Sequence, residues 1–385
     1  MKKVYLDNAA TTPMDSRVID FMYTSMQENF GNPSSTHQFG RSAKSLVETA
    51  RKNIAKHFNV TASEIVFTAG GTEADNLILF NAVNNLKVTR IITSKIEHHA
   101  VLHVVENLQF TKNITVDYVN IDEFGAVDFS NLEQLLSEEK EKTLVSLMHI
   151  NNEIGNILDV KKVSNLCIKH NALFHSDTVQ TIGHYQLDLQ EIPVDFITAS
   201  AHKFHGPKGV GFAYFKKGFG ILPLFFGGEQ ERGARSSTEN VHAILGMEKA
   251  ISFCYAELEK DKKHIEELKT YFINQLKENS AEIEFNGLSN NLKESSFTIV
   301  NVRFPIENAM LLFTLDMAGI AVSGGSACQS GSNKGSHVLQ EFLNEKEANK
   351  TSVRFSFSKF TTKEELDFTL LKLKECLKKN KKPLQ

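Results

Sequence analysis

The chain has 385 residues, of which 41% are hydrophobic and 23% are charged, and its formal net charge is −3. This length can bury a sizeable core and predicts more than one domain. The composition is that of a soluble globular protein, and the small net charge gives no electrostatic reason to expect nucleic acid or a membrane as a partner. Because polar residues follow the first methionine closely and no apolar stretch reaches the length of a membrane span, we expect a cytoplasmic location.

Short β-rich segments alternate with helical patterns from about residue 64 to residue 215. This alternation predicts an α/β fold with a mostly parallel central sheet and helices on both faces. The expected strands are 65–67, 90–93, 116–119, 144–148, 172–175, 196–198 and 210–214.

A long helical pattern rich in Glu and Lys follows, from about residue 241 to residue 279. Beyond it, the sequence predicts a smaller α+β domain with strands at 296–300 and 352–357 and helices at 307–318 and 363–379. We place the domain boundary inside the long helix. This gives a large domain of residues 1–250 and a small domain of residues 251–385, and we expect the first 15 or so residues to pack on the small domain.

Lys203 follows the apolar segment 194–199, which reads as a strand. Open α/β sheets bind ligands at the carboxyl ends of their strands, so the strand places Lys203 at the ligand-binding edge. Burial there would lower the pKa of the lysine amine and make it a nucleophile that can form an imine. A solvated loop lysine is the alternative.

The segment Gly70-Gly71-Thr72 leads from an apolar strand into a helical pattern. Free backbone N–H groups and the Thr72 hydroxyl at such a helix start can bind a phosphate group. The segment lacks the glycine patterns of dinucleotide and nucleoside-triphosphate sites, so neither ligand is indicated. An ordinary strand-to-helix turn is the alternative.

Polar residues also end two other predicted strands of this sheet. Asp177, followed by Gln180, can pair with a pyridinium nitrogen, although an ordinary helix N-cap is the alternative. Asn151 and Asn152 offer amides to a ring hydroxyl or a substrate, although Asn-rich strand ends are common turns. A lysine, a carboxylate and a phosphate-binding turn at one sheet edge are the groups that hold pyridoxal phosphate (PLP).

A series of short motifs runs in order along nearly the whole chain. They are Tyr5-Leu6-Asp7-Asn8-Ala9-Ala10-Thr11-Thr12-Pro13, Phe30-Gly31-Asn32-Pro33-Ser34-Ser35, Gly71-Thr72-Glu73, Glu97-His98, Asn151-Asn152-Glu153-Ile154-Gly155, Asp177-x-x-Gln180, Ser200-Ala201-His202-Lys203, Arg235-Ser236-Ser237-Thr238, Ser326-Ala327-Cys328 and Arg354-Phe355-Ser356. Together they resemble the cysteine desulfurases of the NifS/IscS type, which are fold-type I, class V PLP enzymes. The resemblance implies conversion of L-cysteine to L-alanine, with the sulfur supplied to iron–sulfur cluster assembly or tRNA thiolation.

The resemblance also implies roles for the residues of the cofactor site. Lys203 would be the lysine that forms the imine with PLP, and Asp177 would pair with the ring nitrogen. His98 would stack on the ring and is counted as catalytic. The remaining implied cofactor-binding residues are Gly71, Thr72, Asn152, Gln180, Ser200, His202 and, from the neighbouring subunit of a homodimer, Thr238.

The resemblance further implies that Arg354 binds the substrate carboxylate, together with Asn32 and Asn152 as substrate-binding residues. Without the resemblance, Arg354 reads as a surface strand arginine. Cys328 lies in a segment rich in Ser and Gly, which cannot bury it as a core hydrophobe, so it is a candidate thiolate nucleophile. The resemblance makes Cys328 the residue that receives the sulfur as a persulfide and a ligand for a transferred iron–sulfur cluster; an incidental thiol is the alternative.

The three other cysteines and a pair of histidines could take part in chemistry outside the cofactor site. Cys167, Cys254 and Cys376 have helix-like, partly apolar surroundings and are expected to act as small hydrophobes. His99 and His103 stand four residues apart on a predicted helix; we expect polar helix residues and no resident metal, with a metal site as the alternative.

Other functions on the same scaffold are selenocysteine lysis, aminotransfer and a non-catalytic role. The Cys328 segment speaks against aminotransfer, and the complete set of cofactor residues speaks against a non-catalytic protein. The expected partners are L-cysteine, a second copy of the chain and a sulfur-acceptor protein such as an iron–sulfur scaffold.

Overall fold

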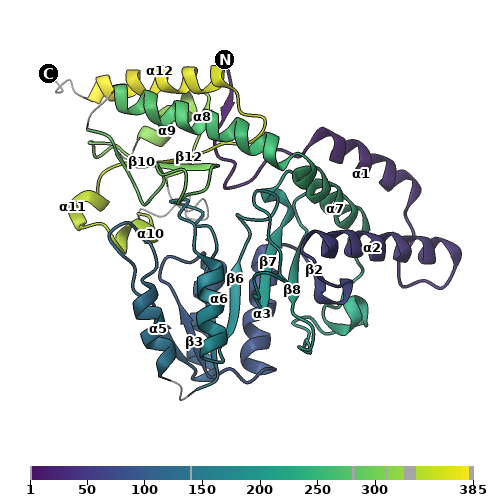
Figure 1. Ribbon diagram of the computed structural model, residues 1–385. Coiled ribbons are helices and arrows are strands. Elements are labelled where there is room, and N and C mark those ends of the chain that lie inside the picture. The colour runs from purple at the N-terminus through teal and green to yellow at the C-terminus, as the bar shows by residue number, and fades with distance from the viewer. Residues whose placement is uncertain (1, 139–140, 280–281, 309, 325–334, 381–385) are drawn as a thin grey trace.

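A computed structural model describes residues 2–138, 141–279, 282–308, 310–324 and 335–380. Its centre is a seven-stranded sheet of order β2-β8-β7-β6-β5-β3-β4, shown in Figure 1. The strands are β2 (Ile65–Thr68), β3 (Arg90–Thr93), β4 (Thr115–Tyr118), β5 (Thr143–Ser146), β6 (Leu173–Asp177), β7 (Phe196–Ser200) and β8 (Gly211–Phe215). The predicted α/β architecture is confirmed.

The sheet is parallel from β4 to β7, whereas β8 is antiparallel to both of its neighbours, β7 and β2. A parallel pair needs a crossover of a dozen or more residues, usually a helix. The connection from β7 to β8 spans only residues 201–210, so β8 returns in the opposite direction. The sheet is therefore mostly parallel, as expected.

Side chains alternate along the strands between two cores, as Ile197 and Phe196 on β7 illustrate. One face of the sheet packs against five helices, and the other face packs against two. The first set is α1 (Ser16–Glu28), α2 (Gln38–His57), α5 (Phe129–Ser137), α6 (Val160–Lys169) and α7 (Val241–Ala256); the second is α3 (Gly71–Asn84) and α4 (His99–Lys112). Because helices cover both faces of the sheet, only the ends of its strands are accessible to ligands.

A separate core forms around a small antiparallel sheet of order β12-β10-β9, at the top of Figure 1. Residues Val4 and Leu6 of the N-terminal segment belong to this core. Its elements are β1 (Val4–Tyr5), α8 (Leu258–Asn279), β9 (Glu284–Phe285), β10 (Ile299–Arg303), α9 (Leu311–Met317), β11 (Ile320–Ala321), β12 (Ser352–Ser356) and α12 (Lys363–Asn380), and the short helices α10 (His337–Gln340) and α11 (Glu345–Ala348) follow β11 in the chain. Within the described residues, no helix is long and apolar enough to cross a membrane.

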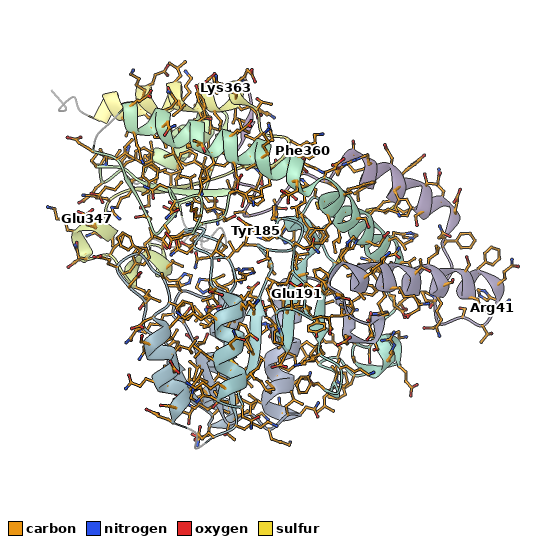
Figure 2. All side chains as sticks on the ribbon, viewed as in Figure 1. Arg41, Tyr185, Glu191, Glu347, Phe360 and Lys363 are labelled. Atoms are coloured by element: carbon orange, nitrogen blue, oxygen red, sulfur yellow. The ribbon has the colours of Figure 1, made fainter. Side chains whose placement is uncertain are left out.

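Three predicted elements differ from the structure by more than two residues, and one of them is the helix expected over 307–318, which is found as α9 over Leu311–Met317. The helix expected over 241–279 is divided at Glu257, whose carboxylate binds Arg17 at 2.7 and 2.9 Å. The strand expected at 296–300 begins only at Ile299, because the preceding backbone bonds elsewhere: Phe297 N donates to the hydroxyl of Tyr185. Tyr185 lies near the centre of the molecule in Figure 2.

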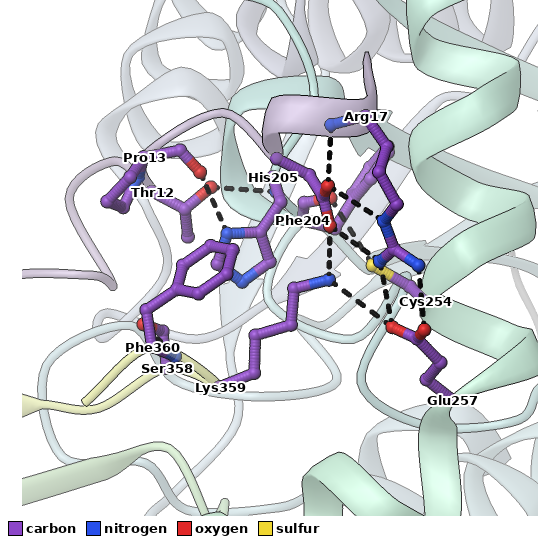
Figure 3. Close-up of polar contacts among 11 residues, drawn as sticks. Thr12, Pro13, Arg17, Phe204, His205, Cys254, Glu257, Ser358, Lys359 and Phe360 are labelled. Carbon is purple, nitrogen blue, oxygen red and sulfur yellow. Dashed lines mark hydrogen bonds and ion pairs between the residues drawn. The ribbon is translucent and has the colours of Figure 1, made fainter. Parts of the chain in front are cut away.

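A network of charges ties the N-terminal segment to both parts of the chain (Figure 3). Asp15 binds Arg17 and Lys359, each at 2.7 Å, and Lys359 is also 3.8 Å from Glu257. Backbone and ring atoms of His205, two residues after Lys203, bind Thr12 and Pro13 in the same region. These contacts hold the N-terminal segment against the turn that carries the lysine of the predicted site.

Replacing Lys359 by methionine is expected to lower the free energy of unfolding by about 2 kcal/mol, because it removes a hydrogen bond to a buried carboxylate. The matched control, Lys372→Met, breaks an exposed pair with Glu375 and is expected to cost less than about 1 kcal/mol. Urea unfolding of both variants measures the difference; equal costs would contradict the prediction.

The same network predicts a pH dependence. Its hydrogen bonds from Arg17 and then Lys359, opposed by burial, hold the pKa of Asp15 well below its usual range. A carboxyl with a depressed folded-state pKa stabilises the fold above its unfolded pKa of about 3.9, and this contribution is lost as the pH falls below that value. The difference between wild type and Lys359→Met should therefore shrink in acid.

Candidate active site

A cavity of about 200 Å³ lies at the carboxyl ends of β6 and β7. The structure brings ten of the predicted site residues together around it: Gly71, Thr72, His98, Asn152, Asp177, Gln180, Ser200, His202, Lys203 and Arg354. They come from α3, from the start of α4, from the ends of three central strands and from β12. The cavity therefore lies where the two cores of the chain meet.

Lys203 ends a single 3₁₀ turn (Ala201–Lys203) that follows β7 directly. Its Nζ atom donates hydrogen bonds to the carbonyl oxygens of Ala9 and Ala10, at 2.7 and 2.9 Å. The side chain is partly buried, and the amine is held against the N-terminal segment. Lys203 thus lines the cavity and is not a solvated loop lysine.

Asp177 is the last residue of β6 and is 5% exposed. Its Oδ1 atom accepts a hydrogen bond from Val179 N at 2.9 Å and one from the hydroxyl of Thr198 at 3.4 Å. Gln180 donates to Ala9 O at 2.9 Å, the same carbonyl that Lys203 binds. The carboxylate therefore caps the turn that follows β6, where the alternative expected a helix, and also lines the cavity.

The start of α3 forms the anion-binding end of the cavity. No side chain caps the helix at Gly70, and the first N–H groups of a helix have no partner within it. A Cβ atom on Gly71 would lie 2.7 Å from a methyl carbon of Val179, so a larger residue would fill this space. With Thr72 and Ser200 beside it, the helix start fits a phosphate group.

Burial favours the neutral form of both site histidines. Burial lowers the pKa of His202 to about 4, and its Nδ1 lies 3.1 Å from the hydroxyl of Thr11. Burial also lowers the pKa of His98, against the opposing effect of Asp177. Because Nδ1 of His98 accepts a hydrogen bond from Ala100 N at 3.1 Å, its proton is on Nε2.

The neighbouring histidines pack by their rings: His99 stacks on His103 at 4.8 Å between centroids and lies 4.4 Å from His337. Across the described residues, no group of three or more His, Cys, Asp or Glu side chains is arranged to hold a metal ion. The metal alternative for His99 and His103 thus gains no support.

Arg354 is 1% exposed, so it is not a surface strand residue. Its Nη1 donates to Asn152 O at 2.7 Å, and its Nη2 donates to Asp7 Oδ1 at 2.8 Å. The Nε atom is buried and has no hydrogen-bond partner in the described part of the chain. Because Nε still has a hydrogen to donate, the guanidinium can bind a carboxylate while Nη1 and Nη2 keep these contacts.

Sequence reasoning missed Asp75 as a cavity residue. It lies on α3, is 1% exposed, and its Oδ1 is 3.4 Å from Nε2 of His175. Burial, reinforced by the charge of Asp177, raises the pKa of Asp75 well above its usual range. Asp7, Ala9 and Ala10 were seen only as parts of a motif, and nothing in the motif showed that they hold Arg354, Gln180 and Lys203.

Three predicted residues are not brought into this cavity. Thr238 is exposed and lines a different cavity, of about 230 Å³, with Arg235. Asn32 is exposed between α1 and α2, where its Oδ1 accepts a hydrogen bond from Ser34 N. Cys328 lies outside the described residues.

The fold and the groups at its sheet edge define a PLP enzyme of fold type I. The chain belongs to the aminotransferase class-V family, whose model matches residues 4–368. Enzymes of this family depend on PLP, which agrees with the uncapped helix start, Asp177 and Lys203 around one cavity.

Individual proteins and solved structures that are similar to this chain have more specific names than the family. The chain is 41% identical over 384 residues to a protein named cysteine desulfurase IscS from Dictyoglomus turgidum, covering 98% of this chain and 95% of the relative. A solved structure described as a NifS-like protein is 38% identical, with a TM-score of 0.90 and coverage of 98% and 100%. A structure of SspA in complex with cysteine is 28% identical, with a TM-score of 0.80 and coverage of 94% and 100%.

Proposed function

We propose that this chain is a PLP-dependent cysteine desulfurase, which converts L-cysteine to L-alanine and moves the substrate sulfur to Cys328 as a persulfide. The observation that carries this proposal is the cavity at the ends of β6 and β7. It places a lysine amine, a buried carboxylate, an uncapped helix start and a buried arginine around one space. The chain's similarity to proteins named cysteine desulfurases supports cysteine as the substrate.

The residues of the cavity would have four roles in binding the cofactor. Lys203 would hold PLP through its amine, and Asp177 would pair with the ring nitrogen. Thr72, Ser200, His202 and the N–H groups at the start of α3 would bind the phosphate, and His98, Asn152 and Gln180 would contact the ring or its hydroxyl. When bound, PLP supplies an electron-poor ring that stabilises negative charge at the substrate α-carbon.

The chain's own residues carry the remaining chemistry. Arg354 binds and orients the substrate carboxylate, and the Lys203 amine removes the proton from the α-carbon. The thiolate of Cys328 then bonds to the substrate sulfur as the carbon–sulfur bond breaks. The electron pair of that bond stays with carbon and takes up a proton, so cysteine and a thiol give alanine and a persulfide.

Replacing Cys328 by alanine is expected to abolish protein-bound persulfide, because it removes the nucleophile that receives the sulfur. Mass spectrometry of the chain after incubation with L-cysteine measures the added sulfur, and alanine is measured in the same sample. The control is Cys167→Ser, a change at a buried thiol within α6, which should keep the persulfide. If Cys328→Ala still formed a persulfide, this role of Cys328 would be wrong.

The protein is a homodimer in this proposal, with Thr238 of each subunit reaching the phosphate site of the other. An open cavity of about 800 Å³ adjoins the phosphate end and is lined by Thr72, Leu224 and Phe225. Large exposed apolar side chains support burial against a partner: Ile19, Tyr23, Met26, Phe30, Phe39, Leu222, Phe225 and Phe226. Sedimentation of the purified protein tests this; a monomer would contradict it.

The remaining assignments are part of the same proposal. An iron–sulfur scaffold or another thiol-bearing protein accepts the sulfur, and Cys328 is a ligand when a cluster is transferred. The chain divides into domains 1–250 and 251–385, which the separate core around β10 and β12 supports. A cytoplasmic location is supported by the buried cysteines Cys167 and Cys254, which are not in disulfide bonds, and cell fractionation tests it.

A further inference from the structure

Three ionisable side chains gather between β6 and α3: Asp75 and Asp177 line the cavity, and His175 lies beside them. His175 and Asp177 are two residues apart on β6 and therefore lie on the same face of the strand. Asp75 reaches this group from α3, which contacts β6 and β7. Their exposed fractions are 0%, 5% and 1%, so water does not stabilise their charges.

The contacts of this cluster form a short chain. Oδ1 of Asp75 is 3.4 Å from Nε2 of His175, and Nδ1 of His175 is 2.9 Å from the hydroxyl oxygen of Ser146. Neither Asp75 Oδ1 nor His175 Nε2 has a hydrogen-bond partner in the described ranges, and they are 3.4 Å apart. A single proton between Asp75 Oδ1 and His175 Nε2 would form a hydrogen bond that gives both buried atoms a partner.

The proton lowers the negative charge that the cluster buries. With Asp75 and Asp177 both ionised and His175 neutral, the cluster would bury two negative charges side by side, which is costly. Burial raises the pKa of Asp75, and the nearby charge of Asp177 raises it further, against the opposing effect of a hydrogen bond with Thr198. Burial lowers the pKa of His175 to about 3, so the proton resides on Asp75. The Asp75 hydroxyl then donates to Nε2, and Nδ1–H of His175 donates to Ser146.

We propose that Asp75 and His175 hold one shared proton beneath Asp177, so that this cluster carries a single negative charge, on Asp177. Asp75 is then a positioning residue: it contributes a neutral, hydrogen-bonded acid that fixes the His175 tautomer and leaves Asp177 as the charged partner of one protonated ring nitrogen. This inference rests on the proposed function, because that function assigns the ring nitrogen to Asp177.

Infrared difference spectroscopy tests the shared proton directly in the full chain, both without PLP and after PLP is restored. At pH 7.5 the wild type should show the carbonyl stretch of a protonated aspartic acid, identified by its shift on ¹³C labelling of aspartate. The band should vanish in Asp75→Asn and should change frequency in His175→Gln, which replaces the acceptor. Glu97 is the matched control: burial raises its pKa to about 8, so Glu97→Gln should remove a glutamic acid band and keep that of Asp75.

A second readout follows the cofactor itself. With ¹⁵N-labelled PLP bound, the ring-nitrogen chemical shift should be the same in Asp75→Asn as in the wild type, because the amide replaces a neutral acid. A shift toward the unprotonated nitrogen would show that Asp75 is ionised and would overturn the proposal. Absence of the aspartic acid band in the wild type, or its persistence in Asp75→Asn, would also overturn it.

These measurements separate the inference from the function. Alanine formation from cysteine is assayed on the same preparations. If the band is present but no alanine forms, the proposed function fails and the shared proton stands. If alanine forms and the band is absent, the function stands and the role of Asp75 fails.

Discussion

Replacing Lys203 by alanine is expected to lower the rate of alanine formation by about 10⁴-fold, because the change removes the base that takes the α-carbon proton. The same amine would hold the cofactor, so the variant should also bind PLP without a covalent bond. Borohydride reduction followed by peptide mass spectrometry measures this bond. In the wild type the label should lie on Lys203, and in the variant it should be absent.

The matched control for this experiment is Lys208→Ala. Lys208 is exposed, lies five residues further along and lines the open cavity that adjoins the phosphate end. Its removal should leave the label on Lys203 and should change the rate only slightly. A Lys203→Ala protein that keeps the wild-type rate would show that Lys203 is not the base. A wild-type protein labelled at another lysine would show that Lys203 does not hold the cofactor.

Lys203 and Asp177 could be predicted from the sequence because Asp177 ends one strand of the sheet and Lys203 lies one short turn beyond the end of another. A parallel sheet brings such positions to one edge whatever the details of packing, so local pattern is sufficient. Arg354 is different: its strand belongs to the second core, and only the contact between the cores brings it to the cavity. Its role therefore came from the resemblance alone.

Asp75 could not be found in this way. It lies between Ala74 and Asn76 near the start of a helix, where an acid is favourable for reasons unrelated to function. Its burial arises because α3 packs on the face of β6 that carries His175. No periodic pattern of hydrophobic residues in the sequence indicates that contact. Thr238 and Asn32 differ again, since both lie outside the cavity; the role predicted for Thr238 requires a neighbouring subunit.

Replacing Arg354 by lysine is expected to raise the KM for L-cysteine by about 10- to 100-fold, since a hydrogen bond to a charged group is worth about 1.5 to 3 kcal/mol. Two of the arginine's donors hold Asn152 and Asp7, while Nε has no partner among the described residues. A lysine can retain the contact with Asp7 but cannot also present a planar fork to the substrate carboxylate.

Two further measurements decide whether Arg354 acts on the substrate or only on the fold. Competitive inhibition by L-alanine, which carries the same carboxylate, should weaken in parallel with the rise in KM. The control is Arg303→Lys: Arg303 is also buried, on the neighbouring strand β10, but its partners Glu284 and Glu347 are outside the cavity. Both variants should lose stability, whereas only Arg354→Lys should raise KM. Equal KM values in the two variants would mean that Arg354 holds the N-terminal segment in place and that another group binds the carboxylate.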